Sequence, residues 1–141
     1  MIDFVEYCVK PTHKERVAAA FPEEYIPAGR LRLHAYKELA QLSSREALER
    51  CRKNLEDRFG KLPKEAENLF TCHAIRTFGV EKKFDSISCV QGKLVVQKGS
   101  QILKARGKFP VIPDTLEPET RLAFLRLILE RDYDIPGPGE E

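Results

Sequence analysis

Residues 43–70 read SSREALERCRKNLEDRFGKLPKEAENLF and contain a helix start, a helix stop and a second helix start. Ser43 stands three residues before Glu46, which is the spacing of a capping box, and Ser44 is an equally suitable N-cap. Gly60 is the residue type that closes a helix, and Pro63 suits the first turn of the next helix, where its missing N–H costs nothing. We therefore predict two helices joined by a short turn.

The helix before Gly60 is amphipathic. Its apolar residues recur every three or four positions, which places them on one buried face; they are Leu48, Cys51, Leu55 and Phe59. The other face carries a dense mixture of charges, and favourable i, i+4 pairs make a solvated surface the simpler interpretation. Asp57 and Arg58 also permit a docking surface, because they lie at the helix end next to the turn.

Upstream of this hairpin the chain is predicted to be extended and then helical. Residues 2–9 are β-branched and aromatic and predict a strand, and residues 17–21 predict a second extended piece. Pro22 and Pro27 keep the residues before them out of helical geometry. Apolar residues at helical spacing then predict a helix over 29–41, with Leu31, Ala35, Leu39 and Leu42 on its apolar face.

Downstream of Pro63 the pattern changes from helix to sheet. Apolar residues over 66–78 predict a third helix that Gly79 closes. Residues 83–90 and 93–97 are strand-like, and the Gln91-Gly92 pair between them has the length and the glycine of a tight hairpin turn. The sheet would bury one face against the helices.

The remaining third of the chain predicts a short helix, an edge strand and a last, longer helix. We expect a short helix over 100–105 and a strand over 108–112, which Pro110 confines to a sheet edge. Asp114 or Thr115 would cap the last helix, with Pro118 in its first turn. Its predicted buried face contains Leu122, Leu125, Ile128 and Leu129.

Together these elements predict one α+β (mixed α/β) domain, in which helical hairpins pack on a small, mainly antiparallel sheet. The expected boundaries are an extended lead-in over 1–21, the domain itself over 22–132 and a flexible tail over 133–141.

Composition narrows the class of protein. Apolar residues make up 42% of the 141 and charged residues 33%, with no apolar run long enough for a membrane span. The N-terminus lacks the features of a secretory signal, so we expect a cytoplasmic location without membrane contact. The four cysteines have no Cys-x-x-Cys spacing, and we interpret Cys8, Cys51, Cys72 and Cys89 as reduced thiols.

The net charge of +2 is unevenly distributed along the chain. Residues 76–108 contain eight basic and two acidic residues, whereas residues 114–141 contain three basic and eight acidic. A basic nucleic-acid-binding accessory domain is therefore an alternative function, using Lys82, Lys83, Lys93 and Lys98.

Motifs for catalysis are weak. The three Gly-Lys pairs are followed by Leu, Leu and Phe and not by Ser or Thr, so none forms a nucleotide-binding P-loop. Cys72 with His73 and His34 would be a thiol–base pair, but adjacent helical residues point about 100° apart. The spacing of cysteines and histidines also disfavours zinc, and His73 fits a hydrogen-bonded core position. We expect no enzyme activity from this chain.

Several short stretches together resemble one family. They are Tyr25-Ile26-Pro27, RLRL at 30–33 with Tyr36, LEDRFGKLP at 55–63, ENL at 67–69, FGVEK at 78–82 and TRL at 120–122. Over about residues 20–130 the chain resembles the C-terminal domain of the bacterial transcription-repair coupling factor, Mfd. The Asp-Arg-Phe-Gly turn followed by Leu-Pro is the most specific part.

The resemblance implies a regulatory, autoinhibitory domain at the end of an ATP-driven DNA translocase. That parent displaces stalled RNA polymerase and recruits UvrA in nucleotide-excision repair, and this domain packs on its UvrA-binding module and restrains it. ATP and Mg²⁺ belong to the parent motor, so no cofactor, metal or catalytic residue is expected here. UvrA, RNA polymerase and double-stranded DNA would be indirect partners.

The resemblance also implies which residues dock. The helix that ends in the Asp-Arg-Phe-Gly turn makes the contact, which assigns Asp57 and Arg58 to inter-domain docking. A family position that is often acidic, one turn earlier, is Asn54 here. The aspartate that commonly follows the Ile-Pro step is Ala28, and the first fifteen residues have no clear match.

Overall fold

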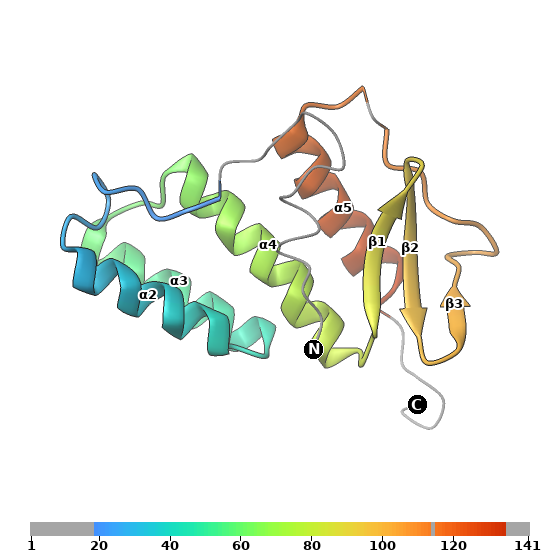
Figure 1. The fold of residues 1–141 in the computed structure, drawn as a ribbon, viewed down its shortest axis with the longest axis horizontal. Coiled ribbons are helices and arrows are strands. Elements are labelled where there is room, and N and C mark those ends of the chain that lie inside the picture. The colour runs from blue at the N-terminus through green and yellow to red at the C-terminus, as the bar shows by residue number, and fades with distance from the viewer. Residues whose placement is uncertain (1–18, 114, 135–141) are drawn as a thin grey trace.

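The computed structural model describes residues 19–113 and 115–134. The predicted strand over 2–9, the first two residues of the second extended piece, Cys8, Asp114 and most of the predicted tail lie outside these residues. The elements in chain order are α2 (Gly29–Gln41), α3 (Arg45–Phe59), α4 (Lys64–Glu81), β1 (Ser86–Val90), β2 (Lys93–Lys98), β3 (Gln101–Leu103) and α5 (Pro118–Asp132). In the described part of the chain, four helices and a three-stranded antiparallel sheet form one α+β domain, which confirms the predicted fold class (Figure 1).

The predicted helical hairpin is present, with one of its two candidate caps. Ser44 is the N-cap of α3, and its hydroxyl accepts a hydrogen bond from the Ala47 N–H at 3.1 Å. The predicted capping box, with Ser43 as the N-cap, is therefore wrong. Gly60 ends the helix with φ +93°, and its N–H donates to the Glu56 carbonyl at 2.9 Å. A positive φ favours glycine, so the turn is specified locally.

The third helix is longer than predicted. Gly79 does not close α4; it lies buried inside a helix that continues to Glu81. Lys83 takes the left-handed position with φ +60°, and its N–H donates to the Val80 carbonyl at 3.1 Å. The Phe84 N–H donates to the Gly79 carbonyl at 2.9 Å, which completes a Schellman motif. The helix therefore ends where Phe84 turns back into the core, because burial of that ring outweighs the backbone preference of lysine.

The sheet has the strand order β1-β2-β3, with both pairs antiparallel. Gln91 and Gly92, at φ +51° and +76°, form the predicted hairpin turn and pair Val90 with Lys93. The helix predicted over 100–105 is wrong. A second tight turn at Gly99, with φ +62°, folds the chain back as β3. The strand predicted over 108–112 is reduced to isolated bridges, one of which joins Lys93 to Val111.

The last helix begins later than the sequence indicates. Its N-cap is Glu117, without a side-chain cap, and Pro118 occupies its first turn, so the predicted cap at Thr115 is wrong. The predicted apolar face of α5 is buried as expected. Tyr133, the first residue of the predicted tail, is also buried, and its hydroxyl donates to the Leu103 carbonyl at 3.3 Å.

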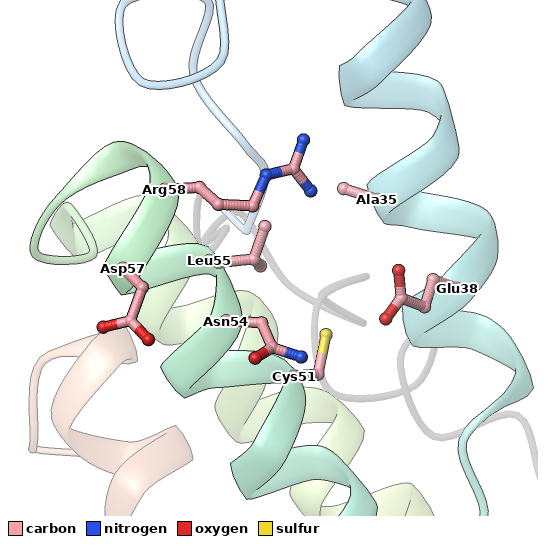
Figure 2. A pocket seen from close by; sticks show the side chains of 7 residues that line it. All are labelled: Ala35, Glu38, Cys51, Asn54, Leu55, Asp57 and Arg58. Atoms are coloured by element: carbon pink, nitrogen blue, oxygen red, sulfur yellow. The ribbon is translucent and has the colours of Figure 1, made fainter.

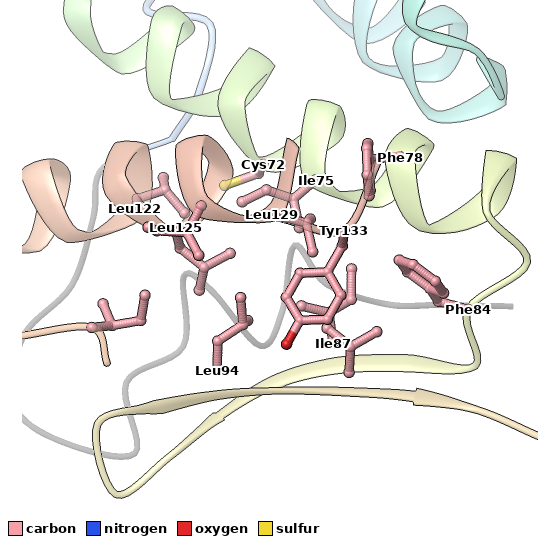
Figure 3. Packing of buried hydrophobic residues seen from close by; sticks show 13 residues of the cluster. Cys72, Ile75, Phe78, Phe84, Ile87, Leu94, Leu122, Leu125, Leu129 and Tyr133 are labelled. Atoms are coloured by element: carbon pink, nitrogen blue, oxygen red, sulfur yellow. The ribbon is translucent and has the colours of Figure 1, made fainter. Parts of the chain in front are cut away.

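Buried side chains form two clusters on opposite sides of α4. We call α2, α3 and the α4 face packed on them the helical half; its largest buried side chains include Phe70, Ile26 and Leu39. The sheet half comprises β1–β3, α5 and the other face of α4. Figure 3 shows the side chains of α4 and α5 pointing together toward the strands. In the described part of the chain, no helix is both long and apolar enough to cross a bilayer.

Polar contacts hold α2 against α4. The Arg76 guanidinium donates from Nη2 to the carbonyls of Leu39 and Leu42, at 3.1 and 2.8 Å, where α2 ends. Its Nε donates to Nδ1 of the buried His73 at 3.1 Å. Arg76 therefore satisfies carbonyls that a helix end leaves without intrahelical partners. His73 is thus buried and hydrogen-bonded, as predicted for a core histidine.

Candidate functional site

A groove of about 260 Å³ lies between α2 and α3 on the helical half. Ala35 and Glu38 line it from α2, and five residues line it from α3: Cys51, Asn54, Leu55, Asp57 and Arg58 (Figure 2). All three predicted docking residues are therefore at this groove.

The base of the groove is apolar. Ala35, Cys51 and Leu55 are each buried, and they are part of the helix-side cluster. Burial, and to a lesser extent the charge of Glu38, raises the pKa of the Cys51 thiol to about 11. The thiol is therefore protonated and uncharged at neutral pH, and it contributes shape and apolar surface rather than a nucleophile.

The rim of the groove is charged. In Figure 2 the Arg58 side chain extends toward Ala35 of α2, while Asp57 points away from α2. The Arg58 guanidinium carbon lies 4.9 Å from the centre of the Phe59 ring, so a cation–π contact orients it. Asp57, Arg58 and Asn54 are exposed, and neither of the two charges has an ion-pair partner in the described part of the chain. They are available to a partner.

The chain before α2 fixes the position of this rim. The Tyr25 hydroxyl donates to the Gly60 carbonyl at 2.7 Å and lies 3.3 Å from the Leu55 carbonyl. Its ring packs on Phe59 with the ring centres 5.8 Å apart. Ile26 is fully buried, which anchors the segment. Sequence reasoning missed this positioning role of Tyr25; a tyrosine before an Ile-Pro step was its only signal.

The candidate thiol–base residues do not come together. Cys72 is buried in the sheet-side cluster, and burial raises the pKa of its thiol to about 12. His73 accepts its hydrogen bond from Arg76, and His34 lies exposed on α2 with its Nε2 3.8 Å from the Glu38 carboxylate. Among the residues that the structure describes, no three Cys, His, Asp or Glu side chains are placed to hold a metal ion.

The described geometry is therefore a groove with an apolar base and, at its rim, two charges that form no ion pair within the described residues. Such a surface gives orientation and specificity to a contact with another protein surface.

Comparisons with known proteins agree with this fold. The family model of the TRCF domain matches residues 16–105, which is well over half of the chain. A crystal structure of the C-terminal domain of transcription-repair coupling factor superposes with a TM-score of 0.54 and 16% sequence identity, over 82% of this chain and 90% of that one. Among curated proteins, none matches the chain. The family model shows that this chain belongs to the TRCF domain family, that of the C-terminal domain of transcription-repair coupling factors.

Proposed function

We propose that this chain is the C-terminal regulatory domain of an ATP-driven, cytoplasmic DNA translocase that displaces stalled RNA polymerase and recruits UvrA. In this proposal the domain has no reaction of its own, and ATP and Mg²⁺ bind in the parent motor. Its groove docks on the UvrA-binding module of the same parent and restrains it. The observation that supports this role is the pair of exposed, unpaired charges, Asp57 and Arg58, at the rim of an apolar groove in a TRCF domain.

The chemistry of the groove fits a contact that must open. Its apolar base is small, and its rim charges are exposed, so complementary charges would set the orientation of the partner more than the strength of binding. A closed state that is favoured by only a few kcal/mol can be opened by a ligand with a similar difference in affinity for the two states. Engagement of the motor with polymerase would provide that difference.

Asn54 weakens this contact by one charge. It lies on the same rim, at the position where the family resemblance indicates an acidic residue. A neutral amide can still donate and accept hydrogen bonds, but it forms no ion pair with a basic partner. The closed state of this protein therefore has one charge pair fewer than the resemblance implies.

The test exchanges the two rim charges in the intact parent protein. The double variant Asp57→Arg, Arg58→Asp leaves the net charge unchanged but places each charge opposite a like charge of the partner. We expect UvrA binding to rise about tenfold and the idle ATPase rate to rise, because a destabilisation of about 1.4 kcal/mol shifts the closed–open ratio tenfold. UvrA pull-down and ATPase rates without polymerase measure this.

The matched control exchanges two charges of the same helix that lie outside the groove, Glu46→Lys with Arg50→Glu. This pair also conserves net charge, and it should change neither UvrA binding nor ATPase activity. Circular dichroism of both isolated domains confirms folding. Equal behaviour of the two double variants would refute docking through this groove.

A further inference from the structure

Within the sheet half, the segment that forms the strands carries positive charge without negative charge. Residues 86–113 contain five basic residues and no acidic residue. They are Lys93, Lys98, Lys104, Arg106 and Lys108. In the helical half, by contrast, acidic and basic residues alternate along α3 and form ion pairs such as Arg52 with Glu67, at 3.5 Å. The acid-free segment spans all three strands and the turns between and after them.

One face of the sheet is covered by no helix in the described part of the chain. Ile87, Leu94 and Val96 are buried against α4 and α5, so their neighbours in the strands face the other way. The strand register places Val90, Lys93 and Val111 side by side across this outer face. Gln97 and Ile102 form another row on the same face. Lys93 thus lies on the central strand, next to the β1–β2 turn, on the face that the described helices do not cover.

Most of the cations on and around this face are unpaired. Arg106 has an exposed fraction of 84% for its side chain and reaches Asp132 only at 4.0 Å. Lys104 lies over the Phe109 ring, with Nζ 5.2 Å from the ring centre. Lys93, Lys98 and Lys108 form no ion pair within the described residues. Their charges are therefore not compensated from within the fold.

The turn after β3 exposes Arg106 at its tip. Ala105 and Lys108 pair through two backbone hydrogen bonds, of 2.9 and 3.0 Å, which leaves Arg106 and Gly107 as a two-residue tip. Arg106 has φ +54°, a left-handed conformation in which glycine or asparagine is the usual residue. The guanidinium is thus exposed at the tip of a rigid hairpin although the backbone would favour another residue type.

Two carboxylates from outside the segment contact it, Asp85 at the Gly99 N–H and Asp132 near Arg106. We propose that this cationic surface, the sheet's outer face with the Arg106 turn, binds the phosphate backbone of duplex DNA. Unpaired lysines and an exposed arginine complement a regular array of phosphates. The outward rows of the strands have serine, valine, lysine, glutamine and isoleucine, and the Phe109 ring next to the turn already lies under Lys104. Among the described residues of this surface, no open aromatic ring is left for unstacked bases, so a duplex is favoured over a single strand. Binding is expected to be independent of sequence.

Direct DNA binding by this surface would be separate from the regulatory role proposed above, in which DNA is only an indirect partner. The two surfaces are also on different halves of the domain: the groove is built by α2 and α3, and the cationic surface by the strands. The 141-residue chain alone tests DNA binding, so this result does not depend on whether the groove docks on the UvrA-binding module.

The experiment is a salt series with fluorescently labelled duplex DNA of about 20 base pairs and arbitrary sequence. About four phosphate contacts predict a slope of log K against log [salt] of about −4, and hence a loss of affinity of about 200-fold between 50 and 200 mM salt. The variant Lys93→Gln, Arg106→Gln, Lys108→Gln should lose about three contacts and reduce the slope to about −1.

A charge-matched control separates a defined surface from general electrostatics. Lys37→Gln, Lys53→Gln, Lys61→Gln removes three exposed lysines of the helical half and gives the same net charge. It should keep the steep slope. An equal loss in both variants, or no measurable binding of the wild-type chain at 50 mM salt, overturns the proposal.

The exposed apolar side chains of Val90, Ile102 and Val111 would also suit a protein partner, and the cations around them would require that partner to be acidic. A glutamate-rich peptide with the same charge as the duplex therefore serves as a competing probe. Displacement of the DNA only at a large excess of peptide supports the proposal. Displacement at equal charge concentration overturns it in favour of an acidic protein.

Discussion

The helical half and the sheet half of this domain use the same central helix but differ in how their charge is arranged. In the helical half, charges of both signs are interspersed, and two of those that form no ion pair within the described residues, Asp57 and Arg58, are at the groove. In the sheet half, the strands and turns carry only positive charge. The two halves therefore present surfaces of different charge, although they fold around one element.

The shared helix explains how two surfaces coexist in a small domain. Both sides of α4 are buried, so its apolar residues extend around most of its circumference, unlike the single apolar face of α3. Each half covers one side of α4 and leaves its own outer surface exposed. We expect the halves to be thermodynamically coupled through α4, because neither can lose it without exposing its own cluster.

Removal of one large ring from each side of α4 tests this coupling. Phe78→Ala acts on the sheet side and Phe70→Ala on the helical side; both rings are almost fully buried. Each variant should lower the free energy of unfolding by about 3–5 kcal/mol through lost burial and the cavity left behind. Urea unfolding followed by circular dichroism should show one transition in both.

Hydrogen exchange provides the sharper comparison. If Phe78→Ala loses protection in β1 and β2 while α2 and α3 remain protected, the halves unfold separately and the coupling is wrong. Ala123→Gly in α5 is a control, since this residue is exposed and its substitution should cost only about 1 kcal/mol.

The contact between His73 and Arg76 predicts a pH dependence that arises in the helical half. Burial, and then the charge of Arg76, lowers the pKa of His73 from 6.5 to about 4. Below pH 6.5 the unfolded chain therefore binds a proton that the folded chain rejects until pH is near 4. Stability should fall across this window, by about 2 kcal/mol between pH 7 and pH 5.

The variant His73→Asn isolates this effect. Its side-chain oxygen can replace Nδ1 as the acceptor for Arg76, but it does not titrate. Urea unfolding at pH 7, 6 and 5 should show a smaller pH-dependent loss in the variant than in the wild type. Parallel curves for the two proteins would assign the pH dependence to other groups.

The smallest expected effect concerns the turn that joins the two halves. Lys83 has φ +60° at the end of α4, a conformation that costs about 1 kcal/mol for a residue with a Cβ. Lys83→Gly removes this strain but gives the unfolded chain more freedom, so a net stabilisation of about 0.5 kcal/mol is expected. Lys83→Ala keeps the strain and should change the melting temperature little. A destabilised glycine variant would contradict the assignment of strain to this position.

Local signals were sufficient where an element ends by backbone chemistry. The predicted bounds of α2 match the structure, Gly60 closes α3, and Gln91-Gly92 makes the hairpin turn. They failed where a distant contact decided the outcome. Gly79 looked like a helix stop, but burial of Phe84 moved the end to Lys83, and pairing with β2 made 101–103 a strand. Each failure is a case in which tertiary contacts outweighed local propensity.

The sequence by itself determined the amphipathic helices, the hairpin and the charge imbalance, because periodicity, glycine positions and composition are properties of neighbouring residues. It also predicted a docking role for Asp57 and Arg58, through a family resemblance. Only the tertiary structure decided that these residues border a groove, since α2 contributes the opposite wall. It alone placed Lys93 on the sheet face that α4 and α5 do not cover and Arg106 at the tip of a turn, because strand register and packing against α4 and α5 set which side chains face outward.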